Sequence, residues 1–126
     1  MKIYEVNFNS NTFMLEANII DINYNTLDEQ YEKLLYILNS EGLDVLDYNN
    51  EIAILVDDCG FEKIGNAIFE VKSEDDLVSV LAGKLLFVRN IYNEESTDFG
   101  SIKSEDIFNL RNYLDIKFKG ILKQKL

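Results

Sequence analysis

The residues that could do chemistry at short spacing lie at positions 57–62. Cys59, the single cysteine, follows Asp57 and Asp58, and Glu62 comes three residues later. Neighbouring carboxylates raise the pKa of a thiol and suppress the thiolate, which is the nucleophilic form. Histidine, the usual general base and the commonest metal ligand, does not occur in the sequence. We therefore expect no catalytic residue and predict that the chain is not an enzyme.

Two weaker motifs lead to the same expectation. Asp57, Asp58 and Glu62 could offer carboxylate oxygens to Mg²⁺ or Ca²⁺, but their spacing matches no EF-hand. We interpret them as a solvated turn and expect no metal and no cofactor. Residues 82–85 (Ala-Gly-Lys-Leu) resemble the end of a phosphate-binding loop but lack its earlier glycine and the Ser or Thr after lysine. We interpret Gly83 as a helix stop.

Charge is distributed unevenly along the chain, whose net charge is −11. Residues 1–110 hold 22 acids against 7 Lys and Arg, a body of −15, whereas residues 111–126 hold 1 acid against 5 bases, a tail of +4. An acidic body repels phosphate, so direct nucleic-acid binding is not expected, and basic proteins are the favoured partners. Acidity that serves only solubility is the alternative.

Apolar periodicity predicts the elements that must position these residues. Residues 2–9 alternate as a strand, and a second strand over about 12–23 would complete a hairpin. Residues 43–48 and 51–56 predict another hairpin around Asn49 and Asn50. The continuous apolar run 52–56 indicates a central strand covered on both faces. Residues 85–91 predict the next strand, and 116–126 predict an edge strand carrying lysines or a basic amphipathic tail, of which we favour the edge strand.

Three helices are expected from capping signals. Thr26 with Glu29 forms a capping box before a helical apolar stripe that ends at Leu38, with Gly42 as the stop. Ser73 predicts the start of a short helix that Gly83 closes, and Ser104 predicts the cap of a last helix through residue 114. The polar stretch 92–100 is interpreted as an exposed hairpin tip.

These elements predict an α+β fold: a mostly antiparallel sheet of about five to seven strands, with about three helices in a single layer on the sheet. With 126 residues and no proline or Gly/Ser linker, we expect one domain over 1–126 with a basic C-terminal segment at 115–126. The chain has no apolar run long enough to cross a bilayer and no signal-peptide pattern, so we expect no membrane partner and a cytoplasmic location.

The order of these pieces resembles a known family. The helix at 25–38, the hairpin into 52–58, the stretch 81–88 and the step 98–101 before the last helix resemble a small uncharacterised phage and plasmid family, domain-of-unknown-function family 3846, over about residues 12–114. The resemblance implies a home on a phage or mobile element and a compact α+β fold, with no activity to transfer. This chain departs from the family at one place: an Asn-Arg pair is expected after the central hairpin, but Asn66 is followed by Ala67.

Three function hypotheses follow. The first is a non-enzymatic phage or mobile-element inhibitor, of anti-CRISPR or anti-restriction type, that occupies the basic nucleic-acid groove of a host defence protein. Its expected contacts are Asp28, Glu29, Glu32, Asp57, Asp58 and Glu62. The second is a protein that sequesters a nucleotide signal in a pocket formed by oligomerisation, so a homodimer stays open. Its expected contacts are Lys117, Lys119, Lys123 and Lys125, Arg89 or Arg111, and Phe99 or Tyr92. The third is a structural or regulatory accessory protein.

Overall fold

The computed structural model describes residues 1–92 and 97–124 and shows two antiparallel sheets and two α-helices. The large sheet has the strand order β2-β1-β7-β4-β3, with β8 paired to β7, and the small sheet has the order β6-β5-β9. Every strand pair is antiparallel. The α+β class and the mostly antiparallel pairing are therefore confirmed.

Nine strands are present among the described residues, more than predicted. They are β1 (Lys2–Asn9), β2 (Met14–Asp21), β3 (Leu43–Asp47), β4 (Ile52–Asp57), β5 (Ala67–Lys72), β6 (Val78–Ala82), β7 (Leu85–Tyr92), β8 (Thr97–Gly100) and β9 (Asp115–Ile121). The helices are α1 (Leu27–Leu38) and α2 (Ser104–Tyr113), and a short 3₁₀ turn, η1 (Gly60–Glu62), follows β4.

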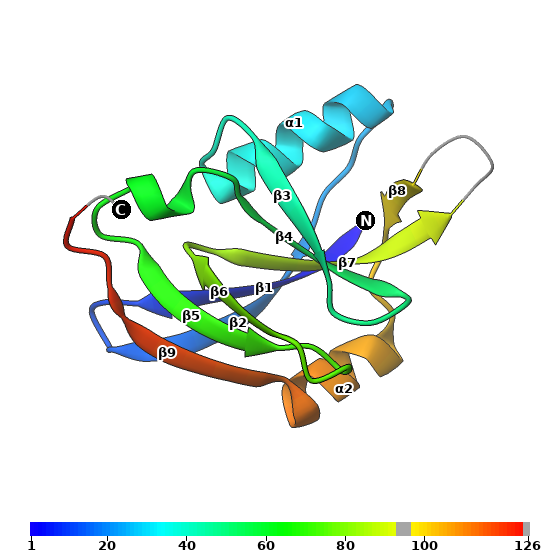
Figure 1. Ribbon diagram of the computed structural model, residues 1–126. Coiled ribbons are helices and arrows are strands. Elements are labelled where there is room, and N and C mark those ends of the chain that lie inside the picture. The colour runs from blue at the N-terminus through cyan, green and yellow to red at the C-terminus, as the bar shows by residue number, and fades with distance from the viewer. Residues whose placement is uncertain (93–96, 125–126) are drawn as a thin grey trace.

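The large sheet separates two apolar cores. On one face Leu34 and Leu38 of α1 pack against Ile3, Leu55 and neighbouring strand residues. On the other face the small sheet and Leu110 of α2 pack against alternate residues of the same strands. Figure 1 shows α1 on one side of the large sheet, with the small sheet and α2 on the other. The expectation of a single helix layer is therefore wrong, because α2 lies on the face opposite α1, which it covers together with the small sheet.

Strand β4 connects the two cores. All six of its residues are buried, and it lies between β7 and β3 in the large sheet. Successive side chains of a strand point to opposite faces, so Ile54 enters the small-sheet core while Leu55 enters the α1 core. The prediction of a doubly covered central strand from the run 52–56 is confirmed.

The helix predicted from Ser73 is wrong. Residues 73–77 form a turn in which Ser73 Oγ accepts a hydrogen bond from Leu77 N at 3.2 Å and Ser73 N donates to Leu77 O at 2.9 Å. The same serine oxygen that caps a helix can close a turn, so the motif does not distinguish the two. The following residues pair with β5 as strand β6, and Gly83 lies at φ +96 in the turn before β7.

Two helix termini also differ from prediction. Thr26 caps α1 as expected, but the helix ends at Asn39, in the left-handed conformation at φ 52, and not at Gly42. The N-cap of α2 is Lys103 and not Ser104, because the Asp106 carboxylate accepts a hydrogen bond from Lys103 N at 2.9 Å. Strand β9 forms one edge of the small sheet, which confirms the edge-strand interpretation. Lys125 lies outside the described residues, as do residues 93–96 of the tip predicted at 92–100, whose last four residues form β8.

Candidate functional site

The acids predicted on α1 lie at its exposed N-terminal end. Asp28 and Glu32 are exposed and make no ion pair with any described residue, whereas Glu29 pairs with Lys33 at 3.3 Å. Glu29 also accepts a hydrogen bond from Asn25 N at 3.3 Å, and its own N–H donates to Thr26 at 3.1 Å. Glu29 therefore stabilises the helix start, and the two other carboxylates remain available to a partner.

Asp57 lies in a different environment from its neighbours. Its side chain is only 4% exposed, its carboxylate lies 2.5 Å from Lys63 Nζ, and it accepts a hydrogen bond from Cys59 N at 2.9 Å. These contacts tie the end of β4 to η1. The structure therefore assigns Asp57 a packing role and leaves Asp58 and Glu62 as the exposed acids of this predicted group.

Cys59 is exposed, and its side chain is a protonated thiol at neutral pH. A hydrogen bond and charge repulsion from Asp58, followed by smaller contributions that include Glu62, raise the pKa of the Cys59 thiol to about 11. The prediction that a neighbouring carboxylate suppresses this thiol is confirmed for Asp58, while Asp57, paired with Lys63, does not contribute. Ligand atoms of Asp57, Asp58 and Cys59 lie within 4.8 Å of one another. Because Lys63 already neutralises Asp57 and the thiol is protonated, we assign no metal to this group.

The described residues include ten exposed acids without an ion pair, which sequence reasoning only partly identified. They are Asp28, Glu32, Glu41, Asp44, Asp47, Asp58, Glu62, Glu74, Asp75 and Asp115. Because these ten side chains are exposed, much of the negative charge of the chain lies on the solvent-accessible surface. The two acids of β3, Asp44 and Asp47, could have been identified from the sequence, because charged residues in a short strand are typical of a sheet edge that is protected from pairing.

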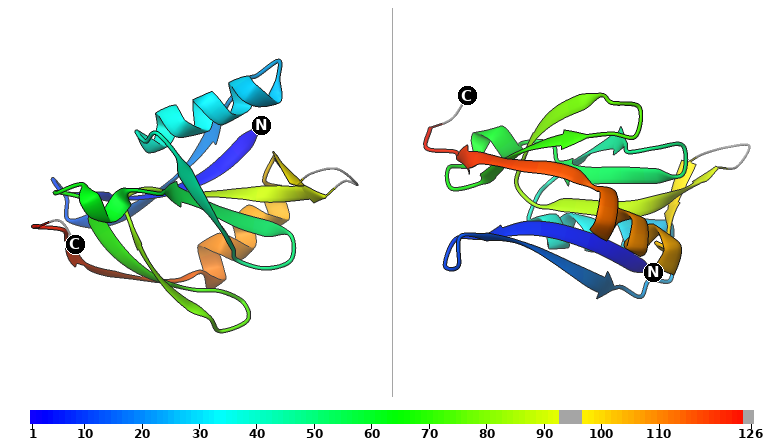
Figure 2. Two further views of the ribbon diagram at one scale, coloured as in Figure 1. Left: turned by 45° about the horizontal axis from the view of Figure 1, so that its top comes forward. Right: turned by 90° about the horizontal axis from the view of Figure 1, so that it is seen from below.

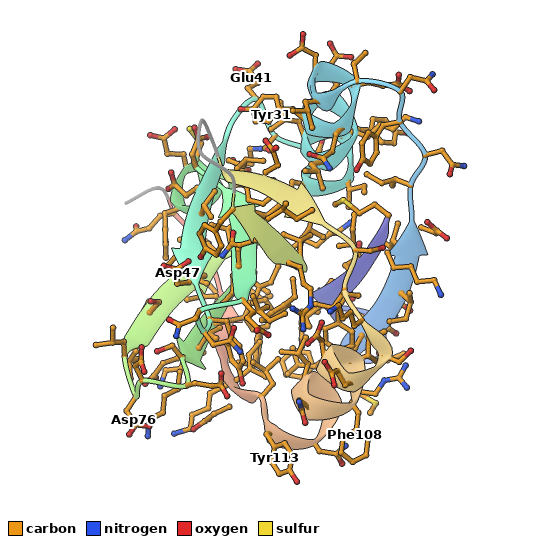
Figure 3. All side chains as sticks on the ribbon, turned by 90° about the vertical axis from the view of Figure 1, so that its right-hand side faces the viewer. Tyr31, Glu41, Asp47, Asp76, Phe108 and Tyr113 are labelled. Carbon is orange, nitrogen blue, oxygen red and sulfur yellow. The ribbon has the colours of Figure 1, made fainter. Side chains whose placement is uncertain are left out.

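Five of these acids form what we call the acidic edge: Glu41, Asp44, Asp47, Asp58 and Glu62. Glu41, Asp58 and Glu62 line one shallow cavity, and Asp44 and Asp58 line the next. Asp44 and Asp47 belong to β3, the edge strand of the large sheet. Figure 3 shows Glu41 at the top of the molecule and Asp47 lower down, near the other end of β3. Asp44 and Asp47 point to opposite faces of this strand, so the acidic edge runs along both of its sides. The structure thus joins Asp58 and Glu62 to acids that the sequence analysis did not single out.

Most basic residues of the body are committed to ion pairs with other acids. Five of the seven Lys and Arg residues at 1–110, all within the described chain, take part in ion pairs: Lys33, Lys63, Lys72, Lys84 and Arg89. Lys63 and Lys84 pair with the buried carboxylates of Asp57 and Glu5. Each of these pairs removes one acid and one base, so the net negative charge of the body remains on the surface, and Lys63 is the one basic side chain of the described chain in the cavity that Glu41, Asp58 and Glu62 line.

Residues expected to hold a nucleotide are partly engaged elsewhere. Arg89 binds the Asp106 carboxylate through two hydrogen bonds of 2.6 and 2.7 Å. The Tyr92 hydroxyl donates to Asn50 O at 3.0 Å, and the half-buried Phe99 packs against the α1 core. Arg111 and Lys123 are exposed, and Lys119 pairs with Glu70 at 3.4 Å. Among the predicted contacts of a nucleotide, the basic residues on or near β9 are therefore the ones that remain mostly available.

Comparison with protein-family models, curated proteins and solved structures finds no match, so the family resemblance stays a prediction. Within residues 1–92 and 97–124, neither helix is long and apolar enough to cross a membrane.

Proposed function

We propose that this chain is a non-enzymatic inhibitor that binds the basic nucleic-acid-binding groove of a host defence protein. The observation that supports the proposal is the set of ten exposed acids without ion pairs, half of which lie on the acidic edge. Fixed carboxylates on a folded scaffold attract a groove built for phosphates and speed the encounter. The phage or mobile-element setting rests on the resemblance alone.

The scaffold beneath the acidic edge is well suited to presenting charge. Strand β3 pairs with β4 through five residue pairs, from Leu43 opposite Asp57 to Asp47 opposite Ala53. Asp58 N donates to Gly42 O at 3.3 Å, which ties the loop before β3 to the end of β4. The acids therefore project from a backbone that is hydrogen-bonded on one side and anchored in both cores. Little conformational entropy is lost when such a surface binds.

The test is a competition experiment against a panel of purified restriction nucleases and CRISPR effectors. We expect the chain to displace labelled DNA or guide RNA from one of them, with an affinity that falls steeply as salt rises. Neutralising the acidic edge (Glu41→Gln, Asp44→Asn, Asp47→Asn, Asp58→Asn and Glu62→Gln) should weaken displacement by at least about ten-fold, since rim charges act mainly through steering and complementarity.

Two comparison variants show which surface binds. Asp28→Asn with Glu32→Gln measures the contribution of α1, and Lys2→Gln, which removes an exposed charge without an ion pair, is the control. Displacement that is insensitive to salt, or unchanged when both acidic surfaces are neutralised, would contradict the electrostatic basis of the proposal. Failure to displace nucleic acid from any member of the panel would count against the groove as target.

A further inference from the structure

A cleft of about 440 Å³ opens where the β3–β4 turn, the β5–β6 turn and α2 meet. Figure 2 shows the two hairpin turns and α2 gathered at the same end of the molecule. The volume lies at the lower end of the range for small-ligand sites. Its lining includes Tyr48, Glu74, Asp76, Asn109, Tyr113 and Asp115.

A cross-link between the two hairpins fixes the shape of this cleft. Glu74 N donates to Tyr48 O at 3.0 Å, which holds the β5–β6 turn against the β3–β4 turn. The bonds between Ser73 and Leu77 close the β5–β6 turn itself. The position of Glu74 beside Tyr48 is therefore set by backbone hydrogen bonds and not by a flexible loop.

Tyr48 forms the buried part of the wall. Its side chain is only 8% exposed, and its ring packs edge-on against Phe87 with 5.9 Å between centroids. No residue of the described chain hydrogen-bonds its hydroxyl. Burial first, and then the nearby charges of Glu74 and Asp115, raise the pKa of Tyr48. The cleft thus holds a polar group without a partner, beside two carboxylates.

The charges around the cleft leave a negative excess. Glu74 and Asp115 make no ion pair within the described residues, whereas Asp76 pairs with Lys72 at 3.5 Å on the exposed rim. Asp106 also lines the cleft, but Arg89 and Lys103 N already occupy its oxygens. Lys72, which lies opposite Asp115 in the β5–β9 pairing and bonds Asp76, is the one basic side chain of the described chain that lines the cleft, so the lining as a whole keeps a negative excess.

We propose that this cleft binds the guanidinium group of an arginine side chain presented by the partner protein. A guanidinium is planar, carries five donors and can span two carboxylates, which a lysine ammonium does less well. The Tyr48 hydroxyl can accept one further hydrogen bond, and the ring of Tyr113, 72% exposed at the mouth, can stack on the cation. The inference rests on the proposed function for the source of the arginine, but the affinity of the cleft can be measured alone.

The experiment is an NMR titration of the isotope-labelled protein with three capped tripeptides, Gly-Arg-Gly, Gly-Lys-Gly and Gly-citrulline-Gly. We expect the arginine peptide to give saturable shifts at the backbone amides of Tyr48, Asn49 and Glu74 and at the Asn109 side-chain amide. The lysine peptide should bind more weakly, and the citrulline peptide, which keeps the shape but loses the charge, should give no saturable shift.

Variants locate the binding. Glu74→Gln with Asp115→Asn should weaken the arginine peptide by at least about ten-fold, the loss expected when hydrogen bonds to charged groups are removed. Tyr48→Phe should weaken it less, and Glu41→Gln with Asp44→Asn, a matched pair outside the cleft, should leave it unchanged. All are conservative changes, and the NMR spectrum of each variant without peptide shows whether that variant is folded.

Equal shifts for the arginine and citrulline peptides, or shifts spread over all exposed acids without saturation, would overturn the inference. Saturable binding at the cleft in a protein that displaces no nucleic acid from the defence panel would uphold this inference and count against the proposed function. Displacement that survives Glu74→Gln with Asp115→Asn, together with no peptide binding, would reject the cleft and retain the acidic edge.

Discussion

Replacing Arg89 by methionine removes the cation from the most buried bidentate ion pair in the described structure. Arg89 extends from β7 to Asp106 of α2, with Nε and Nη2 lying 2.6 and 2.7 Å from the two carboxylate oxygens. The side chains are 14% and 8% exposed. Glu51 and Glu105 also reach Arg89, at 3.1 and 3.7 Å, but both are largely exposed. The pair attaches α2 to the centre of the large sheet.

The cost of this change comes mainly from the carboxylate left behind. Without Arg89, Asp106 keeps only the hydrogen bond from Lys103 N, and removing one partner of a buried pair costs about 3–5 kcal/mol of unfolding free energy. The two exposed glutamates add about 0–1 kcal/mol each. For a chain of this size the loss corresponds to a fall in the melting temperature of roughly 10–20 °C.

Urea and thermal unfolding followed by circular dichroism measure the effect. Lys33→Met, which breaks an exposed pair with Glu29, is the control and should change stability by less than about 0.5 kcal/mol. The double variant Arg89→Met with Asp106→Leu removes the stranded charge, so it should be more stable than Arg89→Met alone, despite losing the α2 cap, worth about 1 kcal/mol. If Arg89→Met behaved like Lys33→Met, or the second substitution gave no rescue, the reasoning would be refuted.

Three further predictions concern single positions. Alkylation of Cys59 at neutral pH should be about ten-fold slower than that of a free thiol, because a pKa of about 11 lowers the fraction of thiolate more than it raises the nucleophilicity of that thiolate. The alkylation rate should rise with pH, and Asp58→Asn should increase the rate at neutral pH. Gly60→Ala should destabilise the fold by about 1–3 kcal/mol, since the added Cβ would lie 2.3 Å from Ala82 O, a contact that calorimetry of the variant tests. Asn39→Gly should raise the melting temperature slightly, by relieving the left-handed cap at φ 52, and a fall would contradict the assigned cap.

Local signals predicted the elements that are stabilised locally. The Thr26 cap with its apolar stripe predicted α1, and the run at 52–56 predicted a doubly buried strand, because a strand covered on both faces needs apolar residues at every position. The start at Ser73 failed because its hydrogen bond suits a helix and a turn equally. Strands β5 and β8 were not predicted at all.

The small sheet shows why β5 escaped prediction. Strand β5 pairs with β6 and with β9, which lies more than forty residues further along the chain. Phe69 and Val71 are buried while Glu70 and Lys72 are half-buried, a short period-2 alternation that the sequence carries and the prediction missed. Strand stability depends on cross-strand partners, and those partners are chosen by the packing of the whole chain.

The sequence by itself determined the acidic charge, the lack of histidine and the protonated state of Cys59, because each depends on residue type or on immediate neighbours. Tertiary structure alone decided which acids are available. Asp57 and Asp58 are adjacent in sequence, yet one is buried against Lys63 and the other is exposed on the acidic edge. Asp57 is the last residue of β4 and is buried, and the chain after η1 brings Lys63 to its carboxylate, whereas Asp58 lies beyond the strand and faces solvent. The folded path of the chain therefore decides which of two adjacent charges becomes a packing contact and which remains on the surface.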